Sequence, residues 1–174
     1  MSRIVVYKSK YGATKTYAEY IAKELSCRVE KAEEITKEEL LGFDEIIYGG
    51  GLYAEMIDGI SLITKNIESL RDKKIVIFTT GLTPVSVREY YDKMVIDKNF
   101  KNIDMSNIKV FNFSGKMIIK ELSFAHKAAL KALEKIMKAK KNPSEMEMLL
   151  IDLCTKSVDE VDVCMADELI EYVK

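Results

Sequence analysis

Apolar and polar positions follow two different periods along the first two thirds of the chain. Short apolar runs rich in β-branched residues predict buried strands at residues 4–7, 27–31, 44–48, 75–78 and 109–113. Between these runs, apolar residues recur every three or four positions, which predicts helices at residues 14–25, 36–42, 60–70 and 85–95. Strands that alternate with helices in this way predict a parallel sheet covered by helices on both faces.

The last third of the chain breaks this alternation. Apolar residues between 122 and 136 form one helical stripe, and Ser144-Glu145-Met146-Glu147 has the capping-box form that opens another helix. A short extended piece at residues 158–163 then precedes a final helix at residues 166–173. We therefore expect a single domain over residues 1–174, with a helical insertion at residues 116–157 ahead of the last helix.

Composition and charge narrow the class of protein. Hydrophobic residues make up 48% of the chain and charged residues 32%, and the net charge of −1 gives no field that would attract nucleic acid. No apolar run approaches the roughly 18 residues of a membrane span, and no signal-peptide core precedes the first strand. Cys27, Cys154 and Cys164 lie far apart without a CxxC pair, which argues against zinc and disulfide bonds. We expect a cytoplasmic protein with reduced thiols, no metal, no nucleic-acid partner and no integral membrane segment.

The clearest candidate chemistry lies between the first strand and the first helix, in the stretch YKSKYGAT at residues 7–14. Backbone N–H groups at the start of a helix bind anions, because the helix dipole favours negative charge there. Gly12 permits close approach of a ligand to the backbone, and Ser9 and Thr14 can donate hydroxyl hydrogen bonds. This stretch therefore predicts a phosphate site at the carboxyl edge of the sheet, where open α/β sheets bind ligands. The alternative is an ordinary strand-to-helix turn with Thr14 as the helix cap.

Other phosphate chemistries fit the sequence less well. The nucleoside-triphosphate pattern GxxxxGK[ST] is missing. Gly49-x-Gly51-x-x-Ala54 imitates a dinucleotide fingerprint, but it follows the third strand and no acidic residue closes a following strand at the required distance. A receiver-type phosphoacceptor needs acidic residues at the end of the first strand, where Ser9 and Lys10 stand.

The stretch Ser9-Lys10-Tyr11-Gly12-Ala13-Thr14 resembles the phosphate loop of flavodoxins, [TS]-x-[TS]-G-x-T, and departs from it at Tyr11. Residues 43–49 resemble the third strand of that family, residues 50–54 its first flavin loop, and Thr79-Thr80-Gly81-Leu82 its second. The resemblance covers most of residues 3–115 and the final helix. It implies a three-layer α/β/α flavodoxin-like sandwich, a parallel five-stranded sheet of order 2-1-3-4-5, and FMN as the cofactor.

More narrowly, the chain resembles the branch of flavodoxin domains that includes menaquinone-dependent protoporphyrinogen oxidase. The shared features are the residue before Gly12, which is not a small hydroxyl, then Gly51-Leu52-Tyr53, and Ser114-Gly115-Lys116 followed by Glu121-Leu122-Ser123-Phe124 and a helical insertion. This resemblance implies an oxidoreductase that passes electrons between a reductant and a quinone or tetrapyrrole-type small molecule.

The resemblance also implies which residues hold FMN. The phosphate would be held by Ser9, Lys10, Tyr11, Gly12, Ala13 and Thr14, and the flavin ring by Gly50, Gly51, Leu52, Tyr53, Thr80, Gly81 and Leu82. Tyr53 would stack on the isoalloxazine ring and, by excluding water, tune its potential; the alternative is a tyrosine that covers the sheet edge. For residues 80–82 the alternative is a helix-start turn set by Pro84. No catalytic side chain is assigned, because the redox chemistry belongs to the flavin.

Two features of the insertion remain open. His126 lies near its apolar stripe, where it is either a proton relay or substrate contact, or a partly buried, hydrogen-bonded histidine. Met117-Ile118-Ile119 and Phe124 either line a hydrophobic substrate surface or pack the insertion.

Three functional classes follow from this reading. The first is the oxidoreductase with a small-molecule acceptor. The second is an electron-carrier flavodoxin that serves redox proteins, although such carriers are often strongly acidic and this chain has a net charge of −1. The third is a flavin-free binding module of the same fold, for which Tyr11 is the best support. The sequence gives no signal for the oligomeric state.

Overall fold

The computed structural model describes residues 1–174, with the side chain of Met146 excepted. Five parallel strands form its central sheet in the spatial order β2-β1-β3-β5-β6. Their bounds are β1 (Arg3–Lys8), β2 (Arg28–Lys31), β3 (Glu45–Tyr53), β5 (Lys74–Gly81) and β6 (Ile108–Ser114). Counted among the parallel strands alone, this is the predicted order 2-1-3-4-5, which is confirmed. A short strand that the sequence did not predict, β4 (Met56–Ile57), pairs antiparallel with the end of β3.

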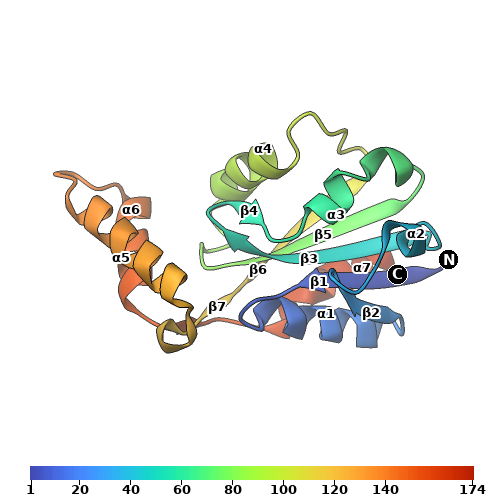
Figure 1. Cartoon of the computed structure of the whole chain (residues 1–174), viewed down its shortest axis with the longest axis horizontal. Coiled ribbons are helices and arrows are strands. Elements are labelled where there is room, and N and C mark those ends of the chain that lie inside the picture. The colour runs from blue at the N-terminus through green and yellow to red at the C-terminus, as the bar shows by residue number, and fades with distance from the viewer.

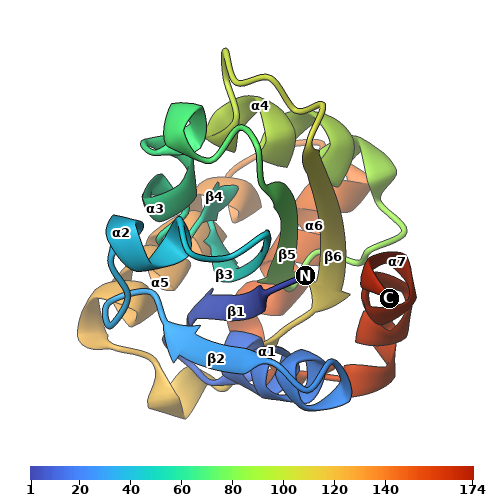
Figure 2. The same ribbon diagram turned by 90° about the vertical axis from the view of Figure 1, so that its right-hand side faces the viewer.

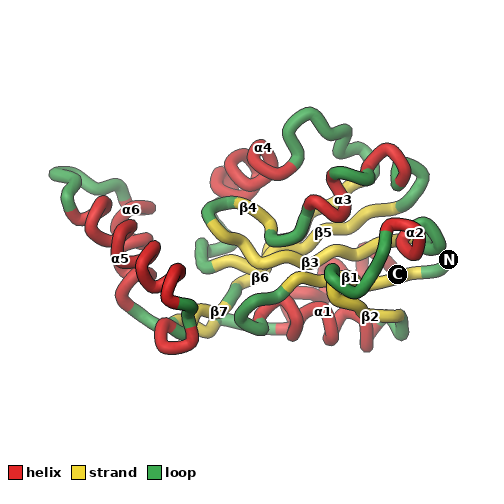
Figure 3. The backbone as a smooth tube through the Cα atoms, in the orientation of Figure 1, coloured by secondary structure: helices red, strands yellow, loops and turns green.

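Helices cover both faces of the sheet, as Figures 1 and 3 show. One face carries α1 (Ala13–Glu24) and α7 (Asp167–Val173), and the other carries α2 (Lys37–Leu40), α3 (Ser61–Thr64) and α4 (Ile96–Asn99). Along β1, Val5 and Tyr7 pack on the α1 and α7 side, while Ile4 and Val6 pack on the opposite side. Burial on both faces explains why the strands appear in the sequence as unbroken apolar runs.

The third strand runs further than the sequence predicts. We expected it to end at residue 48 with the glycines forming a loop, but β3 continues through Gly49, Gly50 and Gly51 to Tyr53. Its neighbours impose this course, since β1 and β5 pair with it on both sides up to Gly50 and Gly51. A Cβ atom at Gly49 would lie 2.0 Å from Cζ of Phe78, so this glycine is needed for close packing rather than for a turn.

The helix predicted over residues 60–70 is interrupted in the structure. Its first part, α3, ends at Thr64, and a 3₁₀ turn follows at Ile67–Ser69. Between them, the Asn66 side-chain amide donates to the Leu62 carbonyl at 2.8 Å. A side chain that bonds to the backbone in this way competes with the helical ladder.

The helix predicted over residues 85–95 lies closer to the C-terminus. The first residues form a turn, in which the Val87 N–H donates to the Pro84 carbonyl at 2.9 Å. A π-helical segment then spans Tyr90–Val95 and continues into α4. The buried Asn99 side chain ties the end of α4 to the β3–β4 hairpin, because it donates to the Glu55 carbonyl at 2.6 Å and accepts from the Ile57 N–H at 2.8 Å. These bonds stabilise the helix as far as Asn99, beyond the predicted end at residue 95.

The insertion stands on a narrow neck formed by two short antiparallel strands, β7 (Lys116–Met117) and β8 (Val158–Asp159). Short 3₁₀ turns lie on either side of the neck, at Ile119–Glu121 and Val163–Ala166. Between the two strands, α5 (Phe124–Lys138) and α6 (Glu145–Thr155) pack against each other. The predicted capping box at residues 144–147 is confirmed. The pair projects from the sandwich beyond the carboxyl ends of the strands (Figure 1), whereas the two termini lie at the amino end, as the turned view in Figure 2 also shows.

Within the described part of the chain, no helix has the length and apolar character needed to cross a bilayer.

Candidate functional site

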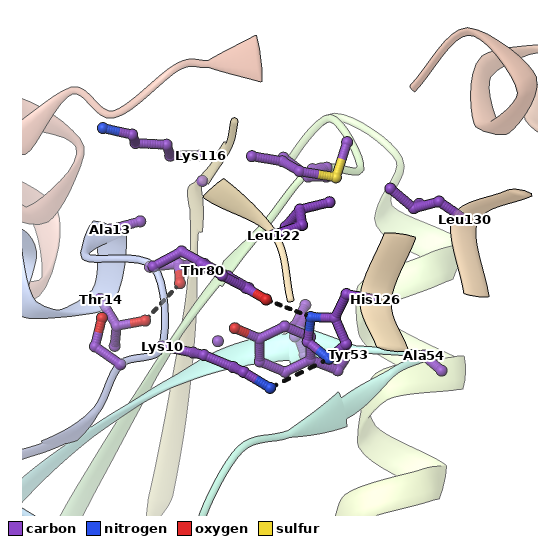
Figure 4. A pocket seen from close by; sticks show the side chains of 18 of the residues that line it. Lys10, Ala13, Thr14, Tyr53, Ala54, Thr80, Lys116, Leu122, His126 and Leu130 are labelled. Atoms are coloured by element: carbon purple, nitrogen blue, oxygen red, sulfur yellow. Dashed lines mark hydrogen bonds between the residues drawn. The ribbon is translucent and has the colours of Figure 1, made fainter. Parts of the chain in front are cut away.

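A cavity of about 390 Å³ lies at the carboxyl edge of the sheet, between the strand ends and α5 (Figure 4). This volume falls within the range of small-ligand sites, roughly 300–1,000 Å³. Eleven of the thirteen residues predicted to hold a cofactor line it, all except Gly12 and Gly50. The cavity therefore brings together three segments that the sequence assigned to one site: the β1–α1 loop and the ends of β3 and β5.

The β1–α1 loop presents the start of α1 to this region. Gly12 occupies the cap position with a left-handed φ of 93°, its N–H donates to Ser9 Oγ at 3.2 Å, and its carbonyl accepts from Thr16 N–H. The first N–H groups of α1, from Ala13 onward, have no acceptor within the helix, so they are free to bind an anion. Gly12 instead lines a second, smaller pocket, together with Thr16 and Asp159. Thr14 does not cap the helix, because Gly12 takes that position.

Two buried hydroxyl groups meet at the polar end of the cavity. Thr14 Oγ1, on α1, lies 2.8 Å from Thr80 Oγ1, on β5, and the two residues are 2% and 5% exposed. One of these hydroxyls donates to the other, which leaves the second with an O–H for a ligand. The neighbouring Thr79 hydroxyl donates to Asn112 Oδ1 instead, at 2.7 Å, and does not line the cavity.

Bare backbone forms the floor between this hydroxyl pair and Tyr53. A Cβ atom at Gly51 would lie 3.2 Å from the Tyr53 ring and 3.6 Å from Thr14 Oγ1, so a side chain there would fill the space between them. Gly50 is not part of this floor, because a Cβ atom on it would lie 2.5 Å from an Ile57 methyl group, away from the cavity. A glycine at position 51 thus keeps open a surface on which a flat group can lie against the backbone.

Tyr53 forms part of the wall beyond this floor. Burial, with a smaller contribution from the Asp58 carboxylate, raises the pKa of its phenol to about 12, so the ring stays neutral at ordinary pH. Its ring centroid lies 5.3 Å from that of His126, at an interplanar angle of 37°. Tyr53 therefore presents an aromatic surface within the cavity, at the place where the sequence predicts a ring-stacking residue.

His126 reaches the same wall from α5 (Figure 4). Its Nδ1 lies 2.7 Å from Tyr11 Oη, and its Nε2 lies 3.4 Å from Lys10 Nζ. Burial, followed by the charge of Lys10, lowers the pKa of the imidazole below its ordinary value. The sequence left His126 between two interpretations, and the structure gives it both a hydrogen-bonded environment and a place in the cavity wall.

The opposite end of the cavity is apolar and comes from the insertion. Of the four candidates from the sequence, Met117 on the neck lies in this wall, whereas Ile118 and Ile119 do not line the cavity and Phe124 is 89% exposed. The helical stripe of α5 was visible in the sequence, but which of its residues meet the strand ends depends on the neck. The residues missed by sequence reasoning are Ala54, Gly115, Lys116, Leu122, Ala129, Leu130 and Leu133.

A comparison with models of protein families gives one match over most of the chain. A family model described as "Flavodoxin domain" matches residues 4–145, which is more than half of the chain. Among curated proteins, none matches the chain significantly.

Several solved structures have a similar arrangement of elements. A flavoprotein in complex with FMN from Lactobacillus acidophilus is 12% identical, with a TM-score of 0.43 over 65% of this chain and 91% of that one. The Trp repressor binding protein from Bacillus subtilis is 14% identical, with a TM-score of 0.49 over 66% and 85%. A flavodoxin bound to flavin mononucleotide from Fusobacterium nucleatum is 16% identical, with a TM-score of 0.40 over 66% and 72%. Because all three scores lie below 0.5, the family assignment rests on the sequence match.

Proposed function

Because this chain belongs to the flavodoxin domain family, we propose that it binds FMN and passes electrons between a reductant and a small apolar acceptor. When bound, FMN supplies the redox chemistry, and the protein supplies binding, orientation and electrostatics. The acceptor would be a quinone or a tetrapyrrole-type molecule, as in enzymes that resemble protoporphyrinogen oxidase.

The residues at the polar end of the cavity fit the cofactor. The phosphate would be held by N–H groups at the start of α1 and by the hydroxyls of Ser9 and Thr14. We also assign the Thr80 hydroxyl to the phosphate, although the resemblance implied a contact with the ring, because it lies 2.8 Å from Thr14 Oγ1. The flat ring would lie on the backbone at Gly51 and Gly81, beside Tyr53. The bare floor at Gly51 supports this fit, because a single Cβ atom would obstruct it.

The observation that carries the choice of acceptor is the position of α5. Its residues Ala129, Leu130 and Leu133 form an apolar wall facing the loops that would hold the cofactor. An apolar wall excludes water and offers burial to a small apolar molecule. A carrier flavodoxin must instead present its cofactor to a protein partner, and the net charge of −1 gives little electrostatic steering toward one.

The side chains at this wall can also assist proton movement. Reduction of a quinone takes up two protons with two electrons. Lys10 provides an ammonium donor at the cavity, and the neutral His126 imidazole can accept or pass on a proton beside it. The neutral phenol of Tyr53 adds no charge next to the ring.

The test is turnover by the purified protein loaded with FMN. We expect reduction of short-chain naphthoquinones or benzoquinones with a chemical or enzymatic reductant, or oxidation of protoporphyrinogen with a quinone present. Turnover confined to redox proteins, with a steep loss of rate as salt rises, would favour the electron carrier. A protein that takes up no FMN at all would support the flavin-free binding module.

A further inference from the structure

Tyr11 is the residue at which the phosphate loop departs from the flavodoxin pattern, and its hydroxyl contacts the insertion at two points. Tyr11 Oη lies 2.7 Å from His126 Nδ1, and it accepts a hydrogen bond from the backbone N–H of Ser123 at 3.3 Å. Ser123 is the N-cap of α5, and its hydroxyl accepts from the His126 N–H. One phenol oxygen therefore joins the cofactor loop to the first turn of the insertion helix.

The contacts around the imidazole assign its proton. The Lys10 ammonium can only donate, so the His126 Nε2 atom beside it, 3.4 Å away, acts as the acceptor. Nδ1 then carries the proton and donates it to Tyr11 Oη. In this arrangement the phenol oxygen accepts from both His126 and Ser123, and its own O–H remains able to donate into the cavity.

Apart from its packing against α6, α5 has few contacts that hold it to the sandwich. None of the side chains in residues 124–138 is buried, and the neck between β7 and β8 consists of two residue pairs. The residues of α5 that face the cavity, His126, Ala129, Leu130 and Leu133, lie on the same side of the helix as the contact with Tyr11. Whether these residues face the cavity thus depends on how the first turn of α5 is positioned.

We propose that Tyr11 and His126 are positioning residues that fix α5 over the cofactor loop and thereby build the acceptor wall. This inference rests on the proposed function for the identity of the acceptor, but the contact itself does not depend on it. It gives Tyr11 a reason to differ from the small hydroxyl residue of the flavodoxin pattern: a longer side chain reaches the insertion.

The first test needs no activity. Amide hydrogen exchange of residues 124–138 would be compared in the wild type, Tyr11→Phe, His126→Ala and the double variant. We expect exchange there to accelerate about five- to tenfold in His126→Ala, the scale of one lost hydrogen bond, and more in Tyr11→Phe, which also loses the bond from Ser123. The double variant should exchange no faster than Tyr11→Phe. The matched control is Tyr20→Phe, which removes a hydroxyl of α1 that donates to Asp167 of α7, outside the insertion. This variant should leave the exchange of residues 124–138 unchanged. Unchanged exchange in Tyr11→Phe, or additive effects in the double variant, would overturn the proposal.

The second test uses the FMN-loaded protein and a quinone. We expect Tyr11→Phe to raise KM about five- to tenfold with kcat changed less than about twofold. His126→Ala should raise KM by a similar factor and also lower kcat, because it removes the proposed proton carrier, and His126→Gln should restore part of the loss in KM. Affinity for FMN should stay within about threefold, because the backbone and ring of residue 11 are kept in Tyr11→Phe. An equal fall in kcat with KM unchanged would contradict a positioning role. If the wild type turns over no acceptor, the proposed function fails while the exchange experiment still decides the role of the contact.

Discussion

The hydroxyl oxygens of Thr14 and Thr80 lie 2.8 Å apart, although one residue belongs to α1 and the other to the end of β5. The contact joins the first turn of the helix that follows the first strand to the end of the fourth parallel strand. Both hydroxyls are buried at the polar end of the cavity, beside the free N–H groups of α1. This pairing defines the end of the cavity that suits a phosphate.

Replacing Thr14 by valine should weaken FMN binding and spare riboflavin. The substitution keeps the shape of the side chain but removes one hydroxyl from the proposed phosphate contacts, and such a charge-assisted bond is worth about tenfold or more in affinity. Titration of the flavin by fluorescence quenching measures both ligands. Thr16→Val, on the exposed side of the same helix turn, is the matched control and should bind FMN as the wild type does. Equal losses for FMN and riboflavin would place the phosphate elsewhere.

Gly51→Val should abolish FMN binding without unfolding the protein. The added atoms would lie between the Tyr53 ring and Thr14 Oγ1, at the floor of the cavity, where a Cβ alone would come within 3.2 Å of the ring. We expect a loss of at least about a hundredfold in affinity, as for other steric blocks that exclude a bound group, with a melting temperature within a few degrees of the wild type. Gly51→Ala should give an intermediate loss. Wild-type affinity in the valine variant would show that the ring does not lie on this floor.

The parallel sheet and the phosphate loop could be predicted because their signals are local. Each strand is a short apolar run buried on both faces, and the exit of β1 combines hydroxyls with a glycine within a few positions. The order of the strands came from the resemblance to flavodoxins, and the structure confirms it. The extension of β3 through its glycines could not be predicted in the same way, because it depends on Phe78 packing across from another strand.

The wall contributed by the insertion could not be predicted for a related reason. Tyr11 and His126 are separated by 115 positions, and nothing in their local sequences indicates that they meet. The stripe on α5 predicts a helix, but its placement follows from the neck of β7 and β8, which is too short to give a periodic signal. Long-range contacts of this kind appear only when the chain is folded.

Tyr53 should influence the reduction potential of the bound cofactor. Its neutral ring excludes water from the cavity wall, which disfavours the more negatively charged reduced flavin. Tyr53→Ser would admit water and raise the midpoint potential; each tenfold change in relative affinity for the two-electron couple corresponds to about 30 mV. Tyr53→Phe keeps the ring and should stay close to the wild-type value. A potential that is the same in all three proteins would mean that Tyr53 only covers the sheet edge.

Glu45 should be important for stability, far from the cavity. It is fully buried, pairs with Arg3 and lies 2.9 Å from Lys74 Nζ, while Arg3 also donates to the carbonyl of Val173 at the end of α7. Glu45→Gln leaves two cations without their anion, and because both cations are partly exposed we expect the free energy of unfolding to fall by about 1–3 kcal/mol. Urea unfolding measures this change. The exposed pair of Lys93 and Glu89 is the control, since Glu89→Gln should cost less than about 0.5 kcal/mol.

The single histidine of the chain gives a direct measure of the contact between α5 and the cofactor loop. Burial, followed by the charge of Lys10, lowers the pKa of His126, so the unfolded chain takes up a proton near pH 6.5 while the folded protein does not. The contribution of a neutral His126 to the free energy of unfolding is therefore fully present above pH 6.5 and is lost as the pH falls below that value. An NMR titration of the imidazole C–H resonance should give a pKa below 6.5, and Lys10→Gln should raise it because the neighbouring charge is gone. A wild-type value at or above 6.5, or one that Lys10→Gln leaves unchanged, would mean that the imidazole does not lie beside this ammonium in solution.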